Sequence, residues 1–219
     1  MKAHPWLIDY TVKNDTKYLI VGTHPPMPYC GKLKFYYGNM NKFWSLLNKV
    51  YPNENIFDEN KCADIQNILK FLDKYRISIT DMVYKTNGES FSIDKNMKVI
   101  ELNPYLKEWI EIGSINTIYF TSKDYKNSAF SLFKKWFRET YGNPLRPIDK
   151  TGNEYIINDK VVKLIKLYSP SPTARRGIAG SNKYKDWLDG REHNKDLLDQ
   201  FIIVSYSKEL PSQMQNIEL

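Results

Sequence analysis

The 219-residue sequence predicts an α/β fold with three layers, α/β/α, around a central, mainly parallel four-stranded sheet. Short apolar runs rich in β-branched and aromatic residues alternate with longer segments whose apolar residues repeat every three or four positions. Such alternation is typical of a parallel sheet with helices on both faces. Two of the apolar runs also lead into proline-rich loops, at residues 22–26 and 169–174. Because the ends of parallel strands meet at one sheet edge, we expect these two loops to lie there together.

The expected strands are four short apolar runs. The first, YLIVG, ends at a glycine, and the last, VVKLIKLYS, forms a hairpin with a short strand at 154–157. A run with alternating faces, ISITD, and a buried run, INTIYFT, lie between them. These four strands cover about residues 17–22, 77–81, 115–121 and 161–168.

Helices are expected between the strands, where apolar side chains repeat with helical spacing. Asn39 or Asn41 can cap the first helix, and Ser122 or Asp124 can cap a later one, because a short polar side chain accepts from free backbone N–H groups. The helices cover about residues 41–51, 61–74, 122–140 and 182–203, with a shorter helix that begins at 103. We expect one domain over residues 1–208 and a polar tail over 209–219.

The composition is typical of a folded protein without a membrane span. Hydrophobic residues make up 42% of the chain and aromatic residues 14%, which is enough to form a core. No apolar run approaches the roughly 18–20 residues that span a bilayer. The first ten residues lack the apolar centre of a signal peptide. We therefore expect a cytoplasmic protein with no membrane partner, and we treat it as a monomer.

Charge and metal-ligating residues narrow the partners. The net charge of +7 permits binding to a phosphate backbone, although a coding bias toward Lys, Asn, Ile and Tyr would give the same excess. Two cysteines, Cys30 and Cys62, are too few for a four-cysteine iron–sulfur cluster. The three histidines lie apart, without metal-site spacing, and the sequence lacks a phosphate-binding glycine loop. We expect no metal and no cofactor.

His24 is the first candidate for a chemical role. It follows the strand that ends at Gly22 and precedes two prolines, each of which disfavours helix for the residue before it. The loop is therefore stiff, and it holds the imidazole at a strand end, where ligands of open α/β sheets bind. A neutral imidazole there can bind and polarise a water molecule. The alternative is a loop histidine that only hydrogen-bonds to the backbone.

The stretch around His24 resembles the first signature of the uracil-DNA glycosylase superfamily. In that signature a strand ends in glycine, two variable positions and proline, and an aromatic loop leads to an Asn-basic-Phe-Trp helix start. Residues 22–25 and 41–44 match these two parts, and the double tyrosine before Gly38 is most similar to the hypoxanthine-DNA glycosylase branch. Residues 169–174, SPSPTA, resemble the His-Pro-Ser-Pro or Ser-Pro loop of the same superfamily. The resemblance covers roughly residues 18–188.

The resemblance implies a DNA repair enzyme, a monofunctional glycosylase that flips a deaminated or damaged base out of DNA and hydrolyses its bond to the sugar. The base is of the uracil or hypoxanthine type, and the partner is DNA that contains it. Catalytic roles are implied for His24 and Ser169. The residues implied to bind the base are Thr23, Tyr36, Tyr37, Asn41, Asp81 and Thr121. Those implied to bind DNA are Ser171, Thr173, Arg175 and Arg176.

The sequence departs from the superfamily at several catalytic positions. His24 stands where Asp or Asn is common, although the hypoxanthine branch also lacks that residue. Ser169 stands where the uracil enzymes place a histidine that stabilises the leaving base, and Thr121 stands where the hypoxanthine branch often has asparagine. Asp81 has an alternative as a carboxylate that braces a loop through backbone N–H groups.

These departures keep a second class of function open, a catalytically silent nucleic-acid-binding protein with the same fold. A third class, a hydrolase of free nucleosides, is disfavoured by Arg175 and Arg176. Arginine suits a loop that wedges into a duplex, because it forks to phosphates and stacks, and a free nucleoside offers no duplex to fill. The alternative is that both arginines are surface residues in contact with solvent only.

Overall fold

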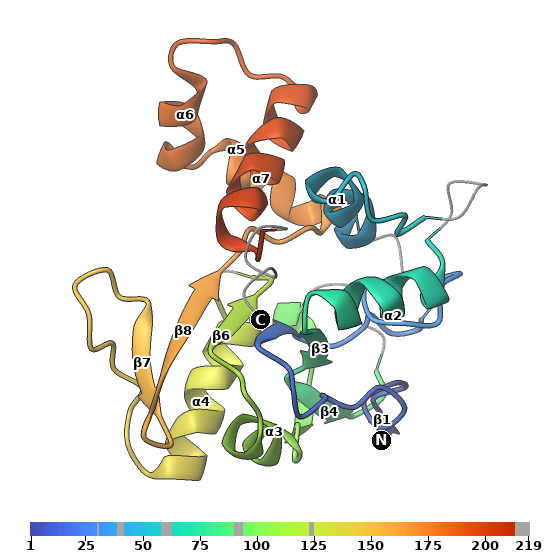
Figure 1. Ribbon diagram of the computed structural model, residues 1–219, viewed down its shortest axis with the longest axis vertical. Coiled ribbons are helices and arrows are strands. Elements are labelled where there is room, and N and C mark those ends of the chain that lie inside the picture. Colours follow the sequence, from blue (N-terminus) through green and yellow to red (C-terminus); the bar gives the residue numbers. More distant parts are fainter. Residues whose placement is uncertain (30, 39–41, 58–62, 90–93, 123–124, 213–219) are drawn as a thin grey trace.

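The computed structural model describes residues 1–29, 31–38, 42–57, 63–89, 94–122 and 125–212. Its centre is a five-stranded sheet in the order β3-β2-β6-β8-β7 (Figure 1). Neighbours from β3 to β8 are parallel, and β7 is antiparallel at the edge. This confirms the α/β class with a mainly parallel central sheet. The strands are Tyr18–Gly22 (β2), Ile77–Asp81 (β3), Thr117–Phe120 (β6), Glu154–Ile157 (β7) and Lys160–Lys166 (β8).

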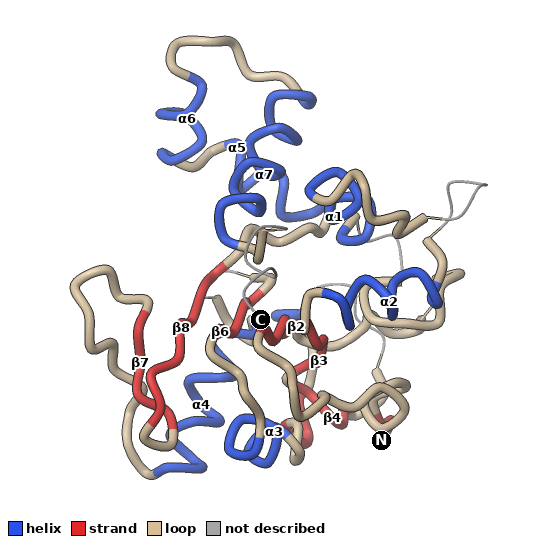
Figure 2. Tube along the Cα trace, in the orientation of Figure 1, coloured by secondary structure: helices blue, strands red, loops and turns tan. Residues whose placement is uncertain are grey.

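Helices lie on both sides of the strands (Figure 2). Ile20 of β2 packs into an apolar cluster with α1, α2 and α7, whereas Leu19 and Val21 pack into a second cluster with α3 and α4. Successive side chains of a strand point to opposite faces, so a strand covered on both faces reads as a continuous apolar run. The helices are Phe43–Val50 (α1), Ile65–Lys74 (α2), Leu106–Ile112 (α3), Ala129–Tyr141 (α4) and Lys195–Glu209 (α7).

A small antiparallel sheet, which the sequence analysis did not predict, flanks the main sheet. Its order is β1-β4-β5, with Lys2–Ala3 (β1), Val83–Thr86 (β4) and Val99–Leu102 (β5). A short 3-10 turn, η1 (Asp94–Asn96), precedes β5. The N-terminal segment therefore joins the domain as a sheet strand, next to the polypeptide that leaves β3.

The predicted helix over 182–203 is wrong, because the chain forms two helices there. They are α6 (Asn182–Leu188) and α7, and the break falls where Asp189 and Gly190 have φ values of 48° and 78°. Asn194 restarts the helix, and its side chain accepts from the backbone N–H of Leu197 at 2.9 Å. Together with α5 (Arg175–Ala179), these helices rise above the rest of the molecule in Figure 1.

The helix predicted from residue 122 begins later, at Ala129 in α4. Asn127 has φ 59° and Ser128 caps the helix, accepting from the backbone N–H of Ser131 at 3.2 Å. Ser122 still contributes, since its hydroxyl accepts from the N–H of Ala129 at 3.0 Å. The other predicted caps, at 39, 41 and 124, lie outside the described residues.

The chain remains packed beyond the predicted domain end at residue 208. Helix α7 continues to Glu209, whose carbonyl accepts from Tyr119 Oη at 2.6 Å. Leu210 is buried, and the carbonyl of Pro211 accepts from Tyr51 Oη at 2.7 Å. Residues 213–219 of the predicted tail lie outside the described residues. Across the part of the chain that is described, no helix combines the length and the apolar character needed to cross a bilayer.

Candidate functional site

The carboxyl ends of β2, β3 and β6 bring several predicted site residues together. Gly22 pairs with Asp81 in register, and Val21 pairs with Phe120, the residue before Thr121. Thr23 and His24 continue directly from β2. Parallel pairing in one register therefore places residues from three distant segments of the chain at one sheet edge, where open α/β folds bind ligands.

His24 is held in one protonation state and one tautomer. Its Nδ1 lies 2.6 Å from the carbonyl oxygen of Pro25, which can only accept, so Nδ1 carries a proton and donates. Burial and, to a smaller extent, the neighbouring His4 together lower the pKa of His24 to about 4. The imidazole is thus neutral at pH 7, and Nε2 has the lone pair of a hydrogen-bond acceptor.

Asp81 is buried beside this imidazole and binds His4, a residue to which the sequence analysis gave no role. The Nε2 of His4 donates to Asp81 Oδ2 at 2.9 Å, and the Nδ1 of His4 accepts from the backbone N–H of Trp6 at 3.2 Å. The His4 ring also contacts His24, with ring centroids 5.1 Å apart. Nothing in the local sequence links His4 to Asp81, because the contact depends on pairing between segments far apart in the chain.

Gly22 and Tyr37 complete the wall around Asp81. A Cβ atom on Gly22 would lie 2.1 Å from Asp81 Oδ1 and 2.7 Å from Tyr37 Oη, so only glycine lets both groups approach β2. The Tyr37 hydroxyl is hydrogen-bonded to Thr121 Oγ1 at 2.9 Å. Its φ of 56° is rare for a bulky residue, which marks it as a position under functional or structural constraint.

The aromatic residues proposed to stack on a base differ in exposure. Phe35 and Tyr36 are almost fully buried, whereas Tyr37 is half-buried and packs on Phe43 with ring centroids 4.2 Å apart. Tyr36 instead contacts His4, at a centroid distance of 5.5 Å. Tyr37 is therefore the ring of this group with surface left for a ligand. The predicted base-binding residue Asn41 lies outside the described residues.

Asp94 was not among the residues predicted for the site. It connects η1 to the end of β2 through hydrogen bonds. Its Oδ2 accepts from Thr23 Oγ1 at 3.0 Å and from the Tyr125 hydroxyl at 3.2 Å. Asn127 donates to the Asp94 carbonyl at 3.2 Å. Burial raises the pKa of Asp94 to about 6, and the charge of Asp81 acts in the same direction. The site thus has a second carboxyl group near the first.

Asp94 makes the fold less stable as pH rises. Because its pKa is about 6 in the fold, against an ordinary 3.8, the folded state holds the proton more tightly between these values. Stability is full below pH 3.8 and falls as pH rises through 6, by about 3 kcal/mol in total. Asp94→Asn should remove this loss, so the variant gains on wild type between pH 4.5 and pH 7.5 in denaturant unfolding.

Asp149 is the matched control for this pH effect. Hydrogen bonds from Thr151 and from the backbone N–H of Glu154 lower the pKa of Asp149 to about 2. Its titration is complete below pH 4, so the difference between Asp149→Asn and wild type should stay flat over the same range. An equally flat difference for Asp94→Asn would show that Asp94 is not held in its protonated form.

The second proline-rich loop contributes residues to a pocket that His24 and Asp81 do not line. It leaves β8 at the same sheet edge and forms η2 (Pro172–Ala174) and then α5. Ser169 lines a pocket of about 110 Å³ between α1, this loop and α7. Ser171 and Thr173 are hydrogen-bonded to each other at 2.9 Å through their hydroxyls. The polar residues that line the pocket are Lys42, Ser45, Lys49, Ser169, Arg175 and Asp199.

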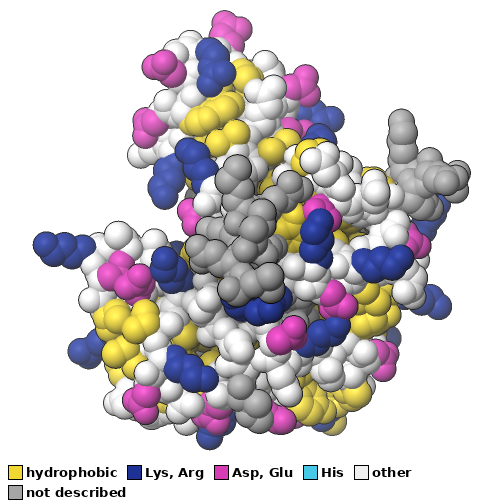
Figure 3. Space-filling view, viewed as in Figure 1, with side chains coloured by type: hydrophobic (Ala, Val, Ile, Leu, Met, Phe, Trp, Pro, Cys, Tyr) yellow, Lys and Arg dark blue, Asp and Glu magenta, His cyan; other side chains and the backbone are white. Residues whose placement is uncertain are grey.

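The two arginines predicted to bind DNA differ from each other. Arg175 forms an ion pair with Asp199 of α7, and only 18% of its side chain is exposed. Arg176 is exposed on the surface. On the face shown in Figure 3, Lys and Arg side chains are scattered rather than gathered in one patch. Arg176 is therefore the arginine of this loop whose side chain is open to solvent.

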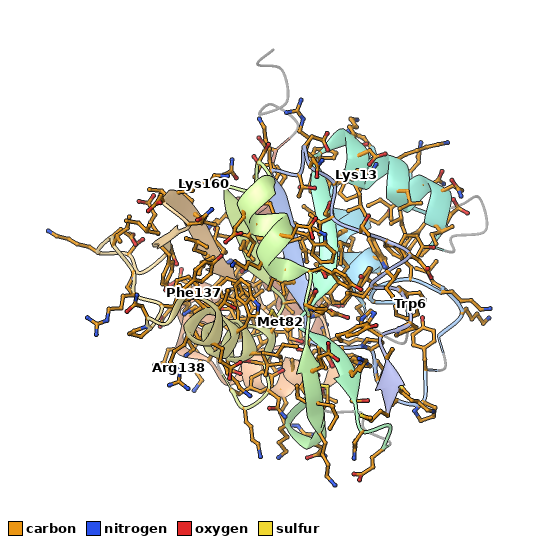
Figure 4. All side chains as sticks on the ribbon, turned by 90° about the horizontal axis from the view of Figure 1, so that it is seen from below. Trp6, Lys13, Met82, Phe137, Arg138 and Lys160 are labelled. Carbon is orange, nitrogen blue, oxygen red and sulfur yellow. The ribbon has the colours of Figure 1, made fainter. Side chains whose placement is uncertain are left out.

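Arg176→Ala should flatten the slope of log affinity against log salt on duplex DNA by roughly 0.9, the value for one lost phosphate contact. Arg175→Ala should instead lower thermal stability, because it breaks the ion pair with Asp199. Affinity measured at several salt concentrations gives the slope. Arg138 is the control, since it is exposed on α4 (Figure 4), which packs in a different apolar cluster from α5 and α7. Equal flattening in Arg138→Ala would mean that overall charge, not this loop, sets the slope.

Within the described residues, no group of three or more His, Cys, Asp or Glu side chains has an arrangement that could hold a metal ion. The side chains described above supply a neutral imidazole, two carboxyl groups and several hydroxyls.

The chain is similar to a protein whose structure has been solved. That protein, from Methanosarcina acetivorans, is described as a "putative Uracil DNA glycosylase", with 19% sequence identity and a TM-score of 0.46. The match covers 82% of this chain and 91% of that one. A likeness of this degree carries no argument about function. No protein-family model matches the chain, and no curated protein matches it.

Proposed function

We propose that the protein is a DNA base-excision glycosylase, which flips a deaminated or damaged base of the uracil or hypoxanthine type out of DNA and hydrolyses its bond to the sugar. The observation that carries the proposal is the position of a neutral imidazole, His24, near a buried carboxylate, Asp81, at the end of parallel strands, with His4 in contact with both. The stretch around His24 resembles a superfamily signature. The second signature loop leaves the same sheet edge.

The reaction needs a positioned water and a negative charge near the sugar. Glycosidic cleavage passes through a transition state that resembles an oxocarbenium ion. His24 Nε2 accepts a hydrogen bond from water and aims its oxygen at C1′ of the sugar. The bond between C1′ and the base nitrogen breaks, and its electron pair leaves with the base. The water oxygen bonds to C1′, and the proton that the water loses neutralises the departing base anion. Asp81 stabilises the positive charge that develops on the sugar.

Hydroxyl groups supply contacts to the flipped base. Thr23, Tyr37 and Thr121 surround the end of β2, and hydroxyls can donate to or accept from the carbonyl and ring nitrogens of a base. The half-buried ring of Tyr37 offers a face for stacking. Ser169 then serves as a donor to the departing base. Neutral contacts of this kind suit uracil and hypoxanthine alike.

Ser171, Thr173 and Arg176 are the proposed contacts to the DNA backbone. Ser171 and Thr173 carry hydroxyls on an exposed turn, and Arg176 adds an exposed cation one turn later. Contacts to phosphate fix the position of the protein on the duplex and carry no sequence information. We propose that the protein acts as a monomer and that its partner is DNA that contains a modified base.

A base-release assay tests the proposal. Oligonucleotides with uracil, hypoxanthine, xanthine or mismatched thymine, each single-stranded and duplex, are incubated with the protein and then cleaved with alkali at abasic sites. We expect strand nicking for at least one modified base and none for the unmodified oligonucleotide. DNA binding without nicking on any substrate would instead favour the catalytically silent binding protein, and neither binding nor nicking would exclude both.

A further inference from the structure

The N-terminal segment reaches the candidate site and is fixed there. Strand β1 pairs with β4, with Lys2 opposite Thr86, and the backbone N–H of His4 donates to the carbonyl of Tyr84 at 2.7 Å. Trp6, which follows, is buried in the apolar cluster that includes α1, α2 and α7, and Leu7 is fully buried. The position of His4 in the site is therefore fixed on both sides, by the pairing of β1 with β4 before it and by the buried side chains of Trp6 and Leu7 after it.

Both ring nitrogens of His4 are committed. Nδ1 accepts from the Trp6 backbone N–H at 3.2 Å, so the proton resides on Nε2, which donates to Asp81 Oδ2 at 2.9 Å. The side chains of His4 and Asp81 are 0% and 7% exposed. A hydrogen bond to a buried carboxylate fixes its rotation, because the alternative leaves a buried charge with one partner fewer.

Anchoring alone does not account for a histidine at this position. Trp6 and Leu7 already supply the buried apolar surface that an anchor requires, with 7% and 0% exposure. An apolar side chain at position 4 would anchor the segment equally well, so what distinguishes histidine there is its hydrogen bond to the buried Asp81 carboxylate. The His4 ring also lies edge-on to His24, with centroids 5.1 Å apart, so it touches both members of the proposed catalytic pair.

We propose that His4 is a positioning residue, which orients the Asp81 carboxylate toward the sugar and supports the imidazole of His24. This rests on the proposed function, in which Asp81 and His24 act on the substrate. His4 itself touches no reacting atom. The arrangement follows the general logic of a reactive group whose base or charge is in turn oriented by a third residue.

Two substitutions at position 4 separate positioning from packing. His4→Leu fills the space but cannot donate, and His4→Gln retains an amide N–H that can reach Asp81. We expect His4→Leu to lower the single-turnover rate of base release by about 10- to 100-fold, the range seen when outer-shell partners are removed. DNA affinity should stay near that of wild type, and His4→Gln should recover most of the rate.

Leu7→Ala is the control for the anchor. It shortens a fully buried side chain of the same segment and retains His4 as the donor to Asp81, so it should lower the melting temperature and leave the rate of the folded protein unchanged. A wild-type rate in His4→Leu would overturn the proposal. So would losses in His4→Leu and His4→Gln that are equal to each other and match the loss in Leu7→Ala.

A second measurement needs no substrate. Imidazole nitrogen chemical shifts should show Nε2 of His4 protonated, and the His24 resonances should change in His4→Leu and in Asp81→Asn. If the wild-type protein releases no base from any DNA, the proposed function fails, yet these spectra still report whether His4 orders Asp81 and His24. His24 resonances that do not change in His4→Leu would overturn the positioning role.

Discussion

His24→Ala should lower the single-turnover rate of base release by about 10²- to 10³-fold, the cost of losing one group that acts in the transition state. The hydrogen bond from His24 Nδ1 to the Pro25 carbonyl fixes the orientation of the ring. The other ring nitrogen, Nε2, is therefore held in a constant direction as the acceptor for the proposed water molecule. A group that positions water stabilises the transition state more than bound DNA. Its loss therefore appears in the rate, and affinity should change little.

The pH dependence offers an independent check on His24. Since the pKa of His24 is about 4, the imidazole can accept a hydrogen bond above pH 5 and loses this capacity below pH 4. The single-turnover rate of base release should therefore stay level above pH 5 and fall below pH 4. His193→Ala is the control, because that ring binds the Tyr184 hydroxyl at 2.9 Å in the helical region of α6 and α7. A wild-type rate in His24→Ala would assign His24 a structural role in its loop.

The sequence allowed the main sheet to be predicted because each of its parallel strands carries its own signal. β2 and β6 are continuous apolar runs, since both faces are covered, and β8 follows a turn at residues 158–159. The small sheet has no comparable signal. β1 spans two exposed residues, and β4 and β5 are four residues each, so only their mutual pairing defines them.

The site was predictable where one loop determines it. Two prolines and a strand end placed His24, and parallel strands placed Asp81 beside it. His4 and Asp94 could not be placed, because they reach Asp81 and Thr23 across 77 and 71 residues of sequence. Such contacts depend on how β1 and η1 dock, and no local spacing encodes that.

A local sequence pattern also could not distinguish the roles of two consecutive residues of the same type. Tyr36 and Tyr37 look equivalent in sequence, yet Tyr37 adopts φ 56° and turns toward Thr121, while Tyr36 is buried against His4. Arg175 and Arg176 diverge in the same way, because a helical turn aims one of them at Asp199 of α7. In both pairs, tertiary contacts and not residue type distinguish a packed side chain from an available one.

Gly22→Ala should destabilise the fold strongly, because the added methyl group has no room beside Asp81 and Tyr37. The new Cβ would lie 2.1 Å from Asp81 Oδ1 and 2.7 Å from Tyr37 Oη, far inside contact distance. Overpacking typically costs about 1–3 kcal/mol. Moving Asp81 also breaks its bond to His4, and hydrogen bonds to charged groups contribute about 1.5–3 kcal/mol.

Together these terms predict a loss of at least about 3 kcal/mol, which lowers the melting temperature by roughly 6–12 °C for a domain of this size. Gly177→Ala is the matched control, because a Cβ there meets nothing within 4 Å, and it should be neutral or slightly stabilising. Removing the carboxylate relieves the closest clash, so Gly22→Ala should cost less in an Asp81→Ala background. Additive losses in the double variant would show that Asp81 does not press on β2, and the geometry that places its carboxylate beside His24 would have to be abandoned.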